Sequence, residues 1–525
     1  MKSIRTLILL SSAASLSVVA NANAADLPVK AKAVEYVRVC SLYGAGFFYI
    51  PGTDTCIKIG GYFRADVTFN GGAHGQPAWS GDIGEHDRYF DYFSDRSRMA
   101  LQIDTRTATE FGAVRTFGQA NFQFTTLGNN TFSPNSLATN LGNNQNLLDT
   151  PGDGFVGIEY LFIQFAGFTF GKSASAYATP WQGFPSNITS FLMGGQNTDT
   201  GVPNIQYTAD FGSGLSFTAG LEDPTVWDRT FLYNLSTGLN AVGTTGNAYA
   251  GVHAPDINVR FRVDQAWGLF QISAAAHQVD GAYNILNASN ATPNNLSEIS
   301  GHPDTKWGGS VMAGLWIKNI PTGVGDDLKM DASYAKGDTK NVISTAGASP
   351  TFAIFGGSGR AYQSLGFGAT TDGVWLPLLN GGTGDIKLTE SFGFRGAYTH
   401  NWNAYWSSAL FGAASFVRYN GSAADVTTAM GQYCAMYITS NRLTAANTSA
   451  DFRCNPNFDV YQIGVNARWT PVKNLAFTAE VQWVGLKQNF AGTATLTPTA
   501  PKPNAVYEFK NQDTVLLQLR VQRNF

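Results

Sequence analysis

The sequence predicts an all-β fold, a closed antiparallel transmembrane β-barrel of about 16 strands with short turns at one end and long loops at the other. Three observations support this prediction. Apolar and polar residues alternate along most of the chain, short and long connections follow one another in turn, and no stretch of 18 or more apolar residues occurs after the first 24 residues. The last observation excludes a helical membrane protein.

The N-terminal residues predict export from the cytoplasm. Residues 1–5 carry two cations, residues 7–20 are apolar, and Ala22-Asn23-Ala24 has the small-x-small pattern of a cleavage site. We therefore expect residues 1–24 to be a signal peptide; a membrane anchor is the alternative, but the apolar run is shorter than the ~20 residues of a spanning helix. Loss of these two cations leaves 32 cations against 37 carboxylates, a net charge of −5, which does not favour a nucleic-acid partner.

The first and last predicted strands show the alternation clearly. In residues 57–69 one face carries Ile57, Ile59, Phe63, Val67 and Phe69, and the other carries Lys58, Tyr62, Arg64, Asp66 and Thr68. In residues 513–525 the apolar face carries Val515, Leu517, Leu519, Val521 and Phe525. Such two-faced ribbons are typical of strands with one face in an apolar environment.

Further strands follow in order along the chain. They are predicted at 97–107, 112–125, 156–166, 168–174, 203–211, 215–222, 256–265, 269–279, 307–318, 328–338, 388–401, 404–418, 458–470 and 475–488. Residues 340–387 and 421–457 form loops whose conformation the pattern does not assign, and the segment 404–418 alternates poorly. With the first and last strands, the total is 16 in the range 57–525, preceded by an N-terminal segment at 25–56 that lies in the periplasm or the lumen.

The connections decide between a soluble sandwich and a membrane barrel. Tight turns at 166–167, 212–214, 266–268, 402–403 and 470–474 alternate with much longer loops. This segregation is typical of an outer-membrane barrel with short periplasmic turns. In hydrocarbon the sheet must close to pair every backbone group, so the apolar face meets lipid and the polar face lines the interior. A barrel of this width is predicted to enclose an aqueous channel for passive diffusion.

Residues 34–62 read VEYVRVCSLYGAGFFYIPGTDTCIKIGGY, and residues 25–30 read ADLPVK. Both stretches closely resemble the mature N-terminus of the alphaproteobacterial general porins of the rhizobial and Brucella type. The resemblance implies a homotrimeric, weakly selective outer-membrane pore for small hydrophilic solutes and ions, in contact with lipid and lipopolysaccharide. It also implies that Phe525 is part of the assembly signal.

The resemblance further implies that the third external loop, residues 174–201, folds inward as a constriction. Tyr177, Trp181 and Asp199 are its candidate site residues. Asp199 is the only charged residue of the loop, which departs from the acid-rich constriction loops common among porins. We therefore do not expect the loop itself to filter solutes by charge.

Charged residues on the inward faces are predicted to line the pore. They are Lys58, Arg64, Asp66, Arg96, Arg98, Asp104, Arg106, Arg115, Arg260, Arg262, Arg395, Arg468, Glu480 and Arg520. If Arg64, Arg106 and Arg520 lie near mid-height, they form a basic wall facing the loop and set up a transverse field. The alternative is that several of these arginines pair with Asp66 or Asp104 and only stiffen the wall.

The four cysteines predict two disulfides in an oxidising compartment, Cys40 with Cys56 and Cys434 with Cys454. Neither pair has metal-ligand spacing, and the six histidines are scattered, so we expect no metal, no cofactor and no catalytic residues.

Three alternative functions remain open. They are a substrate-specific, sugar-type channel with 18 strands and a file of lumen aromatics, an outer-membrane enzyme such as a phospholipase, and an adhesin or purely structural barrel. The sequence has no continuous aromatic file and no obvious Ser/His pair, which favours the diffusion pore and predicts that the protein is not an enzyme.

Overall fold

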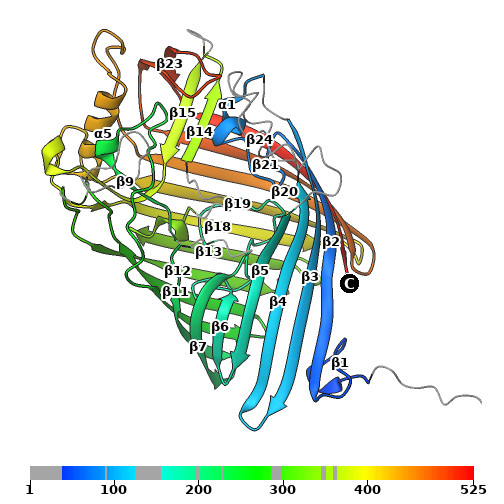
Figure 1. Ribbon diagram of the computed structural model, residues 1–525. Helices are drawn as coiled ribbons and strands as arrows, with labels where there is room; N and C mark the ends of the chain where they lie inside the picture. The colour runs from blue at the N-terminus through cyan, green and yellow to red at the C-terminus, as the bar shows by residue number, and fades with distance from the viewer. Residues whose placement is uncertain are drawn as a thin grey trace, which may run out of the picture.

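The computed structural model describes residues 38–88, 92–125, 155–196, 200–225, 229–284, 298, 300–343, 351–358 and 363–525. The predicted signal peptide and Asp199 lie outside the described residues. Within these ranges, no helix is both long and apolar enough to cross a membrane. Figure 1 shows a barrel of long strands, with shorter elements gathered at one end.

A ring of 16 antiparallel strands closes on itself, because the last strand pairs with the first. The strands are β2 (Thr55–Phe69), β3 (Phe93–Thr109), β4 (Gly112–Thr125), β5 (Phe155–Phe165), β6 (Phe168–Ser173), β7 (Val202–Gly212), β8 (Leu215–Glu222), β10 (Asp256–Gln265), β11 (Gly268–Val279), β12 (Lys306–Lys318), β13 (Asp327–Lys336), β18 (Glu390–Asn401), β19 (Trp406–Arg418), β20 (Phe458–Val472), β21 (Leu475–Gln488) and β24 (Gln512–Asn524). The predicted closed barrel is therefore confirmed, and every predicted strand is present with ends shifted by four residues or fewer.

The outer surface of this ring is apolar. Side chains exposed on the outer face include Ile59, Phe63, Ile103, Phe261, Val465 and Leu519. Residues directly opposite one another in an antiparallel pair project to the same face, so the alternation within each strand adds up to one apolar belt. The inward faces carry the polar half of the pattern.

Short and long connections alternate around the ring, as predicted. The turn between β5 and β6 has two residues, and both Ala166 and Gly167 have positive φ, 49° and 86°. A two-residue hairpin with positive φ at both positions matches the twist of the strands that it joins. At the same end of the barrel, the Phe525 N–H donates to the Gly61 carbonyl at 3.1 Å, and the Phe525 ring lies 5.7 Å from that of Phe63.

The N-terminal segment is attached at this short-turn end. A 3-10 helix, η1 (Ser41–Tyr43), precedes β1 (Phe48–Tyr49), which pairs with the first residues of β2. A disulfide joins Cys40 to Cys56 on β2, as predicted. The segment is therefore fixed to the barrel rim.

The long loops fold together into a cap at the opposite end (Figure 1). The cap contains one sheet of β14 (Thr351–Gly356), β15 (Ser364–Ala369), β22 (Thr493–Leu496) and β23 (Ala505–Phe509), and a second of β9 (Phe231–Asn234), β16 (Thr371–Trp375) and β17 (Lys387–Leu388). Its helices are α1 (Gly81–Glu85), α5 (Ala429–Ser440), η2 (Leu235–Thr237), η3 (Thr339–Asn341) and η4 (Leu378–Asn380). The alternation pattern did not predict this cap.

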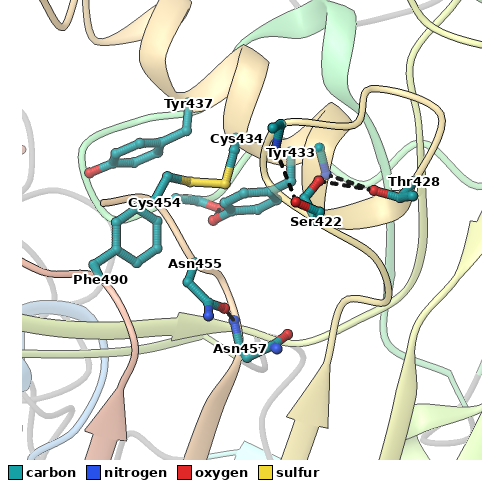
Figure 2. Close-up of a disulfide and its surroundings, with 12 residues drawn as sticks. Ser422, Thr428, Tyr433, Cys434, Tyr437, Cys454, Asn455, Asn457 and Phe490 are labelled. Atoms are coloured by element: carbon teal, nitrogen blue, oxygen red, sulfur yellow. Dashed lines mark hydrogen bonds between the residues drawn. A yellow bond between two sulfur atoms is a disulfide. The ribbon is translucent and has the colours of Figure 1, made fainter. Parts of the chain in front are cut away.

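A second disulfide and a ring of aromatic side chains hold the cap together. Cys434 on α5 is bonded to Cys454, as predicted. Figure 2 shows the bond surrounded by Tyr433, Tyr437 and Phe490. Helix α5 begins at the N-cap residue Thr428, whose hydroxyl accepts from the Gly431 N–H at 3.2 Å.

The core of the cap extends down onto the inner wall of the barrel. The inward faces of β19, β20 and β21 are apolar in their outer halves, and five residues there are buried: Val417, Phe458, Val460, Val484 and Leu486. Phe352 of β14 packs against Phe458 with ring centroids 5.5 Å apart. On this side of the barrel, both faces of the strands are therefore apolar, because lipid covers one and the cap covers the other.

Candidate functional site: the inner wall and the third loop

The candidate site is the interior of the barrel, where register places the predicted charged residues side by side. Arg64 is opposite Arg98, and Asp66 is opposite Arg96 on one side and Arg520 on the other. These residues form an upper arginine cluster, defined as Arg64, Arg96, Arg98 and Arg520 around Asp66. Arg64 and Arg520 do lie near one another, as the hypothesis of a basic wall requires.

Asp66 is the centre of the upper arginine cluster. Arg96 Nε donates to Asp66 Oδ2 at 2.8 Å, and Arg520 Nε donates to Oδ1 at 2.5 Å. Asp66 and Arg96 are both almost fully buried, so loss of either partner leaves an uncompensated buried charge. One carboxylate holds two guanidinium groups, and the cluster keeps a positive excess.

Of the other two arginines of the cluster, Arg64 has neutral partners, whereas Arg98 also forms an ion pair with Glu159 on β5 at 3.8 Å. Arg64 Nε donates to Gln522 Oε1 at 2.9 Å, and its guanidinium lies 4.5 Å from the centroid of the Tyr62 ring. Arg98 Nε donates to Gln123 at 2.5 Å. Arg64 therefore keeps its positive charge facing the interior, while the charge of Arg98 is offset by Glu159.

A lower arginine cluster lies toward the short-turn end, defined as Arg106 and Arg115 around Asp104, with Lys58 opposite Asp104 in register. Both arginines donate to Asp104 Oδ2 at 3.0 Å. The prediction that Arg106 stands with Arg64 and Arg520 is wrong, because Arg106 is opposite Cys56 at the end of the strand. Pairing with Asp104, the alternative considered, is what the structure shows for this residue.

The N-terminal segment covers part of this lower cluster. The Arg106 guanidinium lies 4.9 Å from the ring centroid of Phe47 and 5.7 Å from that of Tyr43. Cation–π contacts of this kind hold the guanidinium over the rings while its charge remains available to solvent. The Cys40–Cys56 disulfide fixes the segment that carries both rings.

The described residues of the loop 174–201 fold into the barrel, and the tip of the loop reaches the far wall. Glu480 on β21 accepts from the backbone N–H groups of Ile188 and Thr189 at 2.7 and 2.9 Å. Arg520 Nη2 donates to the Ile188 carbonyl at 3.0 Å. The tip is therefore held by one carboxylate and by one member of the upper arginine cluster.

The returning half of the loop is clamped to the wall of β18 and β20. Arg395 forms an ion pair with Asp331 at 2.8 Å and donates to the carbonyls of Leu192 and Gln196. Gln462 accepts from the Met193 N–H at 2.8 Å and donates to the Phe191 carbonyl at 2.6 Å. The loop therefore follows the inner wall from β11 to β24, where Arg520 holds its tip, and leaves the side of β2 to β5 facing the bore.

A close approach of backbones fixes this path. At Gly194, where φ is +97°, an added Cβ would lie 2.6 Å from the Phe394 carbonyl oxygen on β18. No other residue type fits this position without displacing the strand or the loop.

Four predicted pore-lining residues are corrected by their burial. Asp66 and Arg96 are each 1% exposed and pair with one another, so they do not meet open water. Arg395 and Glu480 face inward, but the loop covers them, and they are 2% and 0% exposed. Their polar groups hold the loop and do not line open water. An inward position in the alternation is therefore not sufficient to place a side chain in the bore.

The other predicted residues lie at separate positions. Tyr177 is buried at the base of the loop, where the neighbouring Ala176 N–H donates to Glu222, and Trp181 donates to the Gly183 carbonyl. Elsewhere on the wall, Arg260 donates to Thr218, Arg262 pairs with Asp264, and Arg468 is exposed.

Three lumen aromatics were missed by the sequence analysis. Phe117 on β4 and Tyr160 and Phe162 on β5 form an aromatic patch, and the ring of Phe117 lies 5.4 Å from Phe162 and 6.2 Å from Tyr160. A β-bulge between β4 and β5 shifts the alternation within β5. The position of Phe117 between Arg115 and Gln119 on the inward face was the signal available in the sequence.

In the part of the chain that the structure describes, no group of three or more His, Cys, Asp or Glu side chains is placed to hold a metal ion.

Comparison with known proteins bears on the whole chain. The family model described as "Porin subfamily" matches residues 26–518. Porin Omp2b of Brucella neotomae is 30% identical over 325 residues, which cover 58% of this chain and 79% of that protein. Porin Omp2a of Brucella ovis is 31% identical over 312 residues, 58% of this chain and 84% of that protein.

Comparison with solved structures bears on the fold. The outer membrane channel DcaP of Acinetobacter baumannii superposes with a TM-score of 0.53 over 91% of this chain and 99% of that one, at 15% identity. At this identity, the likeness supports the barrel fold alone.

Proposed function

This chain belongs to the porin subfamily, and from that premise we propose a route and a charge preference for its solutes. The protein lies in the outer membrane and forms a water-filled channel through which small hydrophilic solutes and ions diffuse passively. The proposed route runs between the loop 174–201 and the wall of β2 to β5. The proposed preference is for anions over cations.

One observation carries the charge preference: a basic wall faces a loop that has almost no charge. The inward faces of β2 to β5 and β24 carry seven cations, Lys58, Arg64, Arg96, Arg98, Arg106, Arg115 and Arg520, against three carboxylates, Asp66, Asp104 and Glu159. The loop supplies a single carboxylate, Asp199, so an entering anion meets a positive potential that the opposite side does not balance.

The experiment is a bilayer measurement of ion selectivity. A KCl gradient across a membrane that contains the protein should give a reversal potential favouring chloride. We expect Arg64→Gln to reduce this preference by about twofold, because a unit charge ~8 Å from the path in water contributes about 0.5 kcal/mol. Arg468→Gln, which removes a charge on another part of the wall, is the matched control. Equal effects of the two variants, or a preference for potassium, would overturn the proposal.

The remaining roles are proposed on the same premise. Residues 1–24 direct export, and residues 25–56 form a periplasmic segment before the barrel at 57–525. Phe525 serves in assembly, which its contacts with Gly61 and Phe63 at the closure of the barrel support. The protein acts as a homotrimer in contact with lipid and lipopolysaccharide, and it is a channel without catalytic activity.

A further inference from the structure

The loop after β2 forms a tight hairpin against the inner wall of the barrel. In this inner hairpin, defined as residues 71–77, the Gly72 N–H donates to the Gln76 carbonyl at 2.7 Å. The Ser94 hydroxyl on β3 donates to the Gly71 carbonyl at 2.9 Å and fixes the base of the inner hairpin to the wall. The inner hairpin is therefore a small, defined unit beside the upper arginine cluster.

The inner hairpin helps to hold the tip of the loop 174–201. The Thr189 hydroxyl donates to the Gly75 carbonyl at 2.6 Å, and the Ser190 N–H donates to the His74 carbonyl at 3.2 Å. These two hydrogen bonds add to those that β21 and β24 make with the same tip. The tip is thus held between the far wall and the inner hairpin, so the position of the inner hairpin bears on the width of the bore.

The side chain of His74 is joined to the basic wall by hydrogen bonds of fixed direction. Arg98 Nε donates to the amide oxygen of Gln123 at 2.5 Å, so the amide nitrogen of Gln123 is the end that faces His74 Nε2, 2.8 Å away. An amide nitrogen donates and does not accept, so His74 Nε2 is the acceptor and carries no proton. The geometry therefore requires a neutral imidazole.

Positive charge predominates around this neutral imidazole. The charged side chains on the strands packed against it, and on their ion-pair partners, are four arginines and two carboxylates: Arg64, Arg96, Arg98, Arg520, Asp66 and Glu159. Neither the rest of the inner hairpin nor residues 174–196 carries a charged side chain. Burial and the two β3 arginines hold the pKa of His74 well below 6.5. His74 keeps part of its surface exposed, so a proton can reach it from water.

We propose that His74 is a proton-operated switch that narrows the channel in acid. Protonation of Nε2 turns an acceptor into a donor and sets its N–H against the N–H of Gln123. Gln123 cannot turn over, because its oxygen is bound to Arg98. The imidazolium is also repelled by the arginines of β3. The inner hairpin then moves off the basic wall into the bore, where the path for solutes narrows.

This inference rests on the proposed function, because the path that narrows is the proposed route between the loop 174–201 and the basic wall. The test is single-channel conductance in KCl as the pH is lowered. We expect the wild-type conductance to fall reversibly, with a midpoint below about pH 6.5. His74→Gln offers Gln123 an acceptor that takes up no proton, so it should lose this acid response. His302→Gln, in a distant external loop, should retain the response.

A second variant should move the acid response without removing it. Gln123→Glu places a carboxylate where it accepts from both Arg98 and protonated His74, so the midpoint should rise by about 1 pH unit. Gln119→Glu is the matched control, because it adds the same charge to the same face of β4 but beside Gln102. It should leave the midpoint within about 0.3 pH unit of the wild-type value.

Three results would overturn the inference: a wild-type conductance that is constant in acid, an acid response in His74→Gln equal to that of the wild type, or an unchanged midpoint in Gln123→Glu. Conductance at neutral pH shows that each variant has folded. Chloride preference without an acid response would contradict this inference alone, whereas potassium preference with an intact acid response would contradict only the proposed charge preference.

Discussion

Two regions of the barrel wall use the same alternating pattern for different purposes. On the side of β2 to β4 and β24, the inward faces carry arginine, glutamine and aromatic side chains beside the bore. On the side of β18 to β21, the inward faces carry Arg395, Gln462 and Glu480, which bind the loop, and apolar residues such as Phe458, which bind the cap. On the proposed route the first region meets solutes, and the second holds the loop and the cap.

The difference teaches what makes an inward residue a pore residue. Lipid requires every strand of the ring to be apolar on its outer face. The outer faces of the two regions therefore show the same alternation of apolar residues in the sequence. The inner face is free to vary with what covers it. An inner face that is polar and has no segment folded over it lines water. An inner face that is apolar, or whose polar groups bind backbone groups of a loop, is part of a packed core.

The largest expected effect comes from breaking the covered side. Phe458→Ala removes a ring that is 0% exposed and leaves a cavity beneath β14. We expect a loss of about 3–5 kcal/mol in the free energy of unfolding of the cap. Denaturant unfolding and limited proteolysis of the cap would measure this loss. Leu379→Ala, at a cap position that is 83% exposed, should change little; equal effects of the two variants would show that the cap has no continuous core with the wall.

A smaller effect is expected at the tip of the loop. Glu480→Gln removes the negative charge that accepts two backbone N–H groups, a contribution of about 1.5–3 kcal/mol for hydrogen bonds to a charged group. The loosened loop should increase open-channel current noise in single-channel recordings. Glu390→Gln, which removes a carboxylate paired with Lys336 at the rim, should leave the noise at the wild-type level. Wild-type current noise in Glu480→Gln would contradict the role of Glu480 in holding the loop tip.

The smallest effect concerns pH. His74, in the loop after β2, has a pKa well below 6.5, because it is buried, and nearby Arg96 and Arg98 lower the pKa further. Its neutral form is favoured in the folded state, so the unfolded chain takes up a proton first as pH falls below about 6.5. The contribution of neutral His74 to the free energy of unfolding is fully present above about pH 6.5. Below this pH it is lost, at up to about 1.4 kcal/mol per pH unit.

Replacement of His74 tests the direction of this pH dependence of stability. His74→Gln should flatten the dependence of the denaturant midpoint on pH between 7 and 5, while His302→Gln, in a distant external loop, should not. An unchanged slope in His74→Gln would mean that this histidine is already charged in the folded protein.

Most of the fold could be predicted from the sequence, because barrel strands are local patterns with a fixed period. The strands, their order and the long third loop follow from alternation and connection length. The cap could not be predicted, because its core joins segments far apart in the chain, such as Phe352 with Phe458 and Cys434 with Phe490. The inward apolar residues Val417, Phe458 and Val460 were a sign that something packs inside.

The candidate site was predictable only in part. Alternation placed Arg64 and Arg520 on one face, but the height of each residue depends on register, which puts Arg106 at the rim with Asp104. The bulge between β4 and β5 concealed Tyr160 and Phe162. The pairing of Asp66 with two arginines also depends on which strands become neighbours when the barrel closes.

The most direct test of the central claim asks which wall meets the solute. The four cysteines form two disulfides, so a single introduced cysteine is the only free thiol. A bulky charged thiol reagent should reduce the single-channel current of Gln119→Cys, on the open wall, and leave Ala413→Cys, buried behind the loop, unaffected. Current reduction in Ala413→Cys and none in Gln119→Cys would contradict the proposed route.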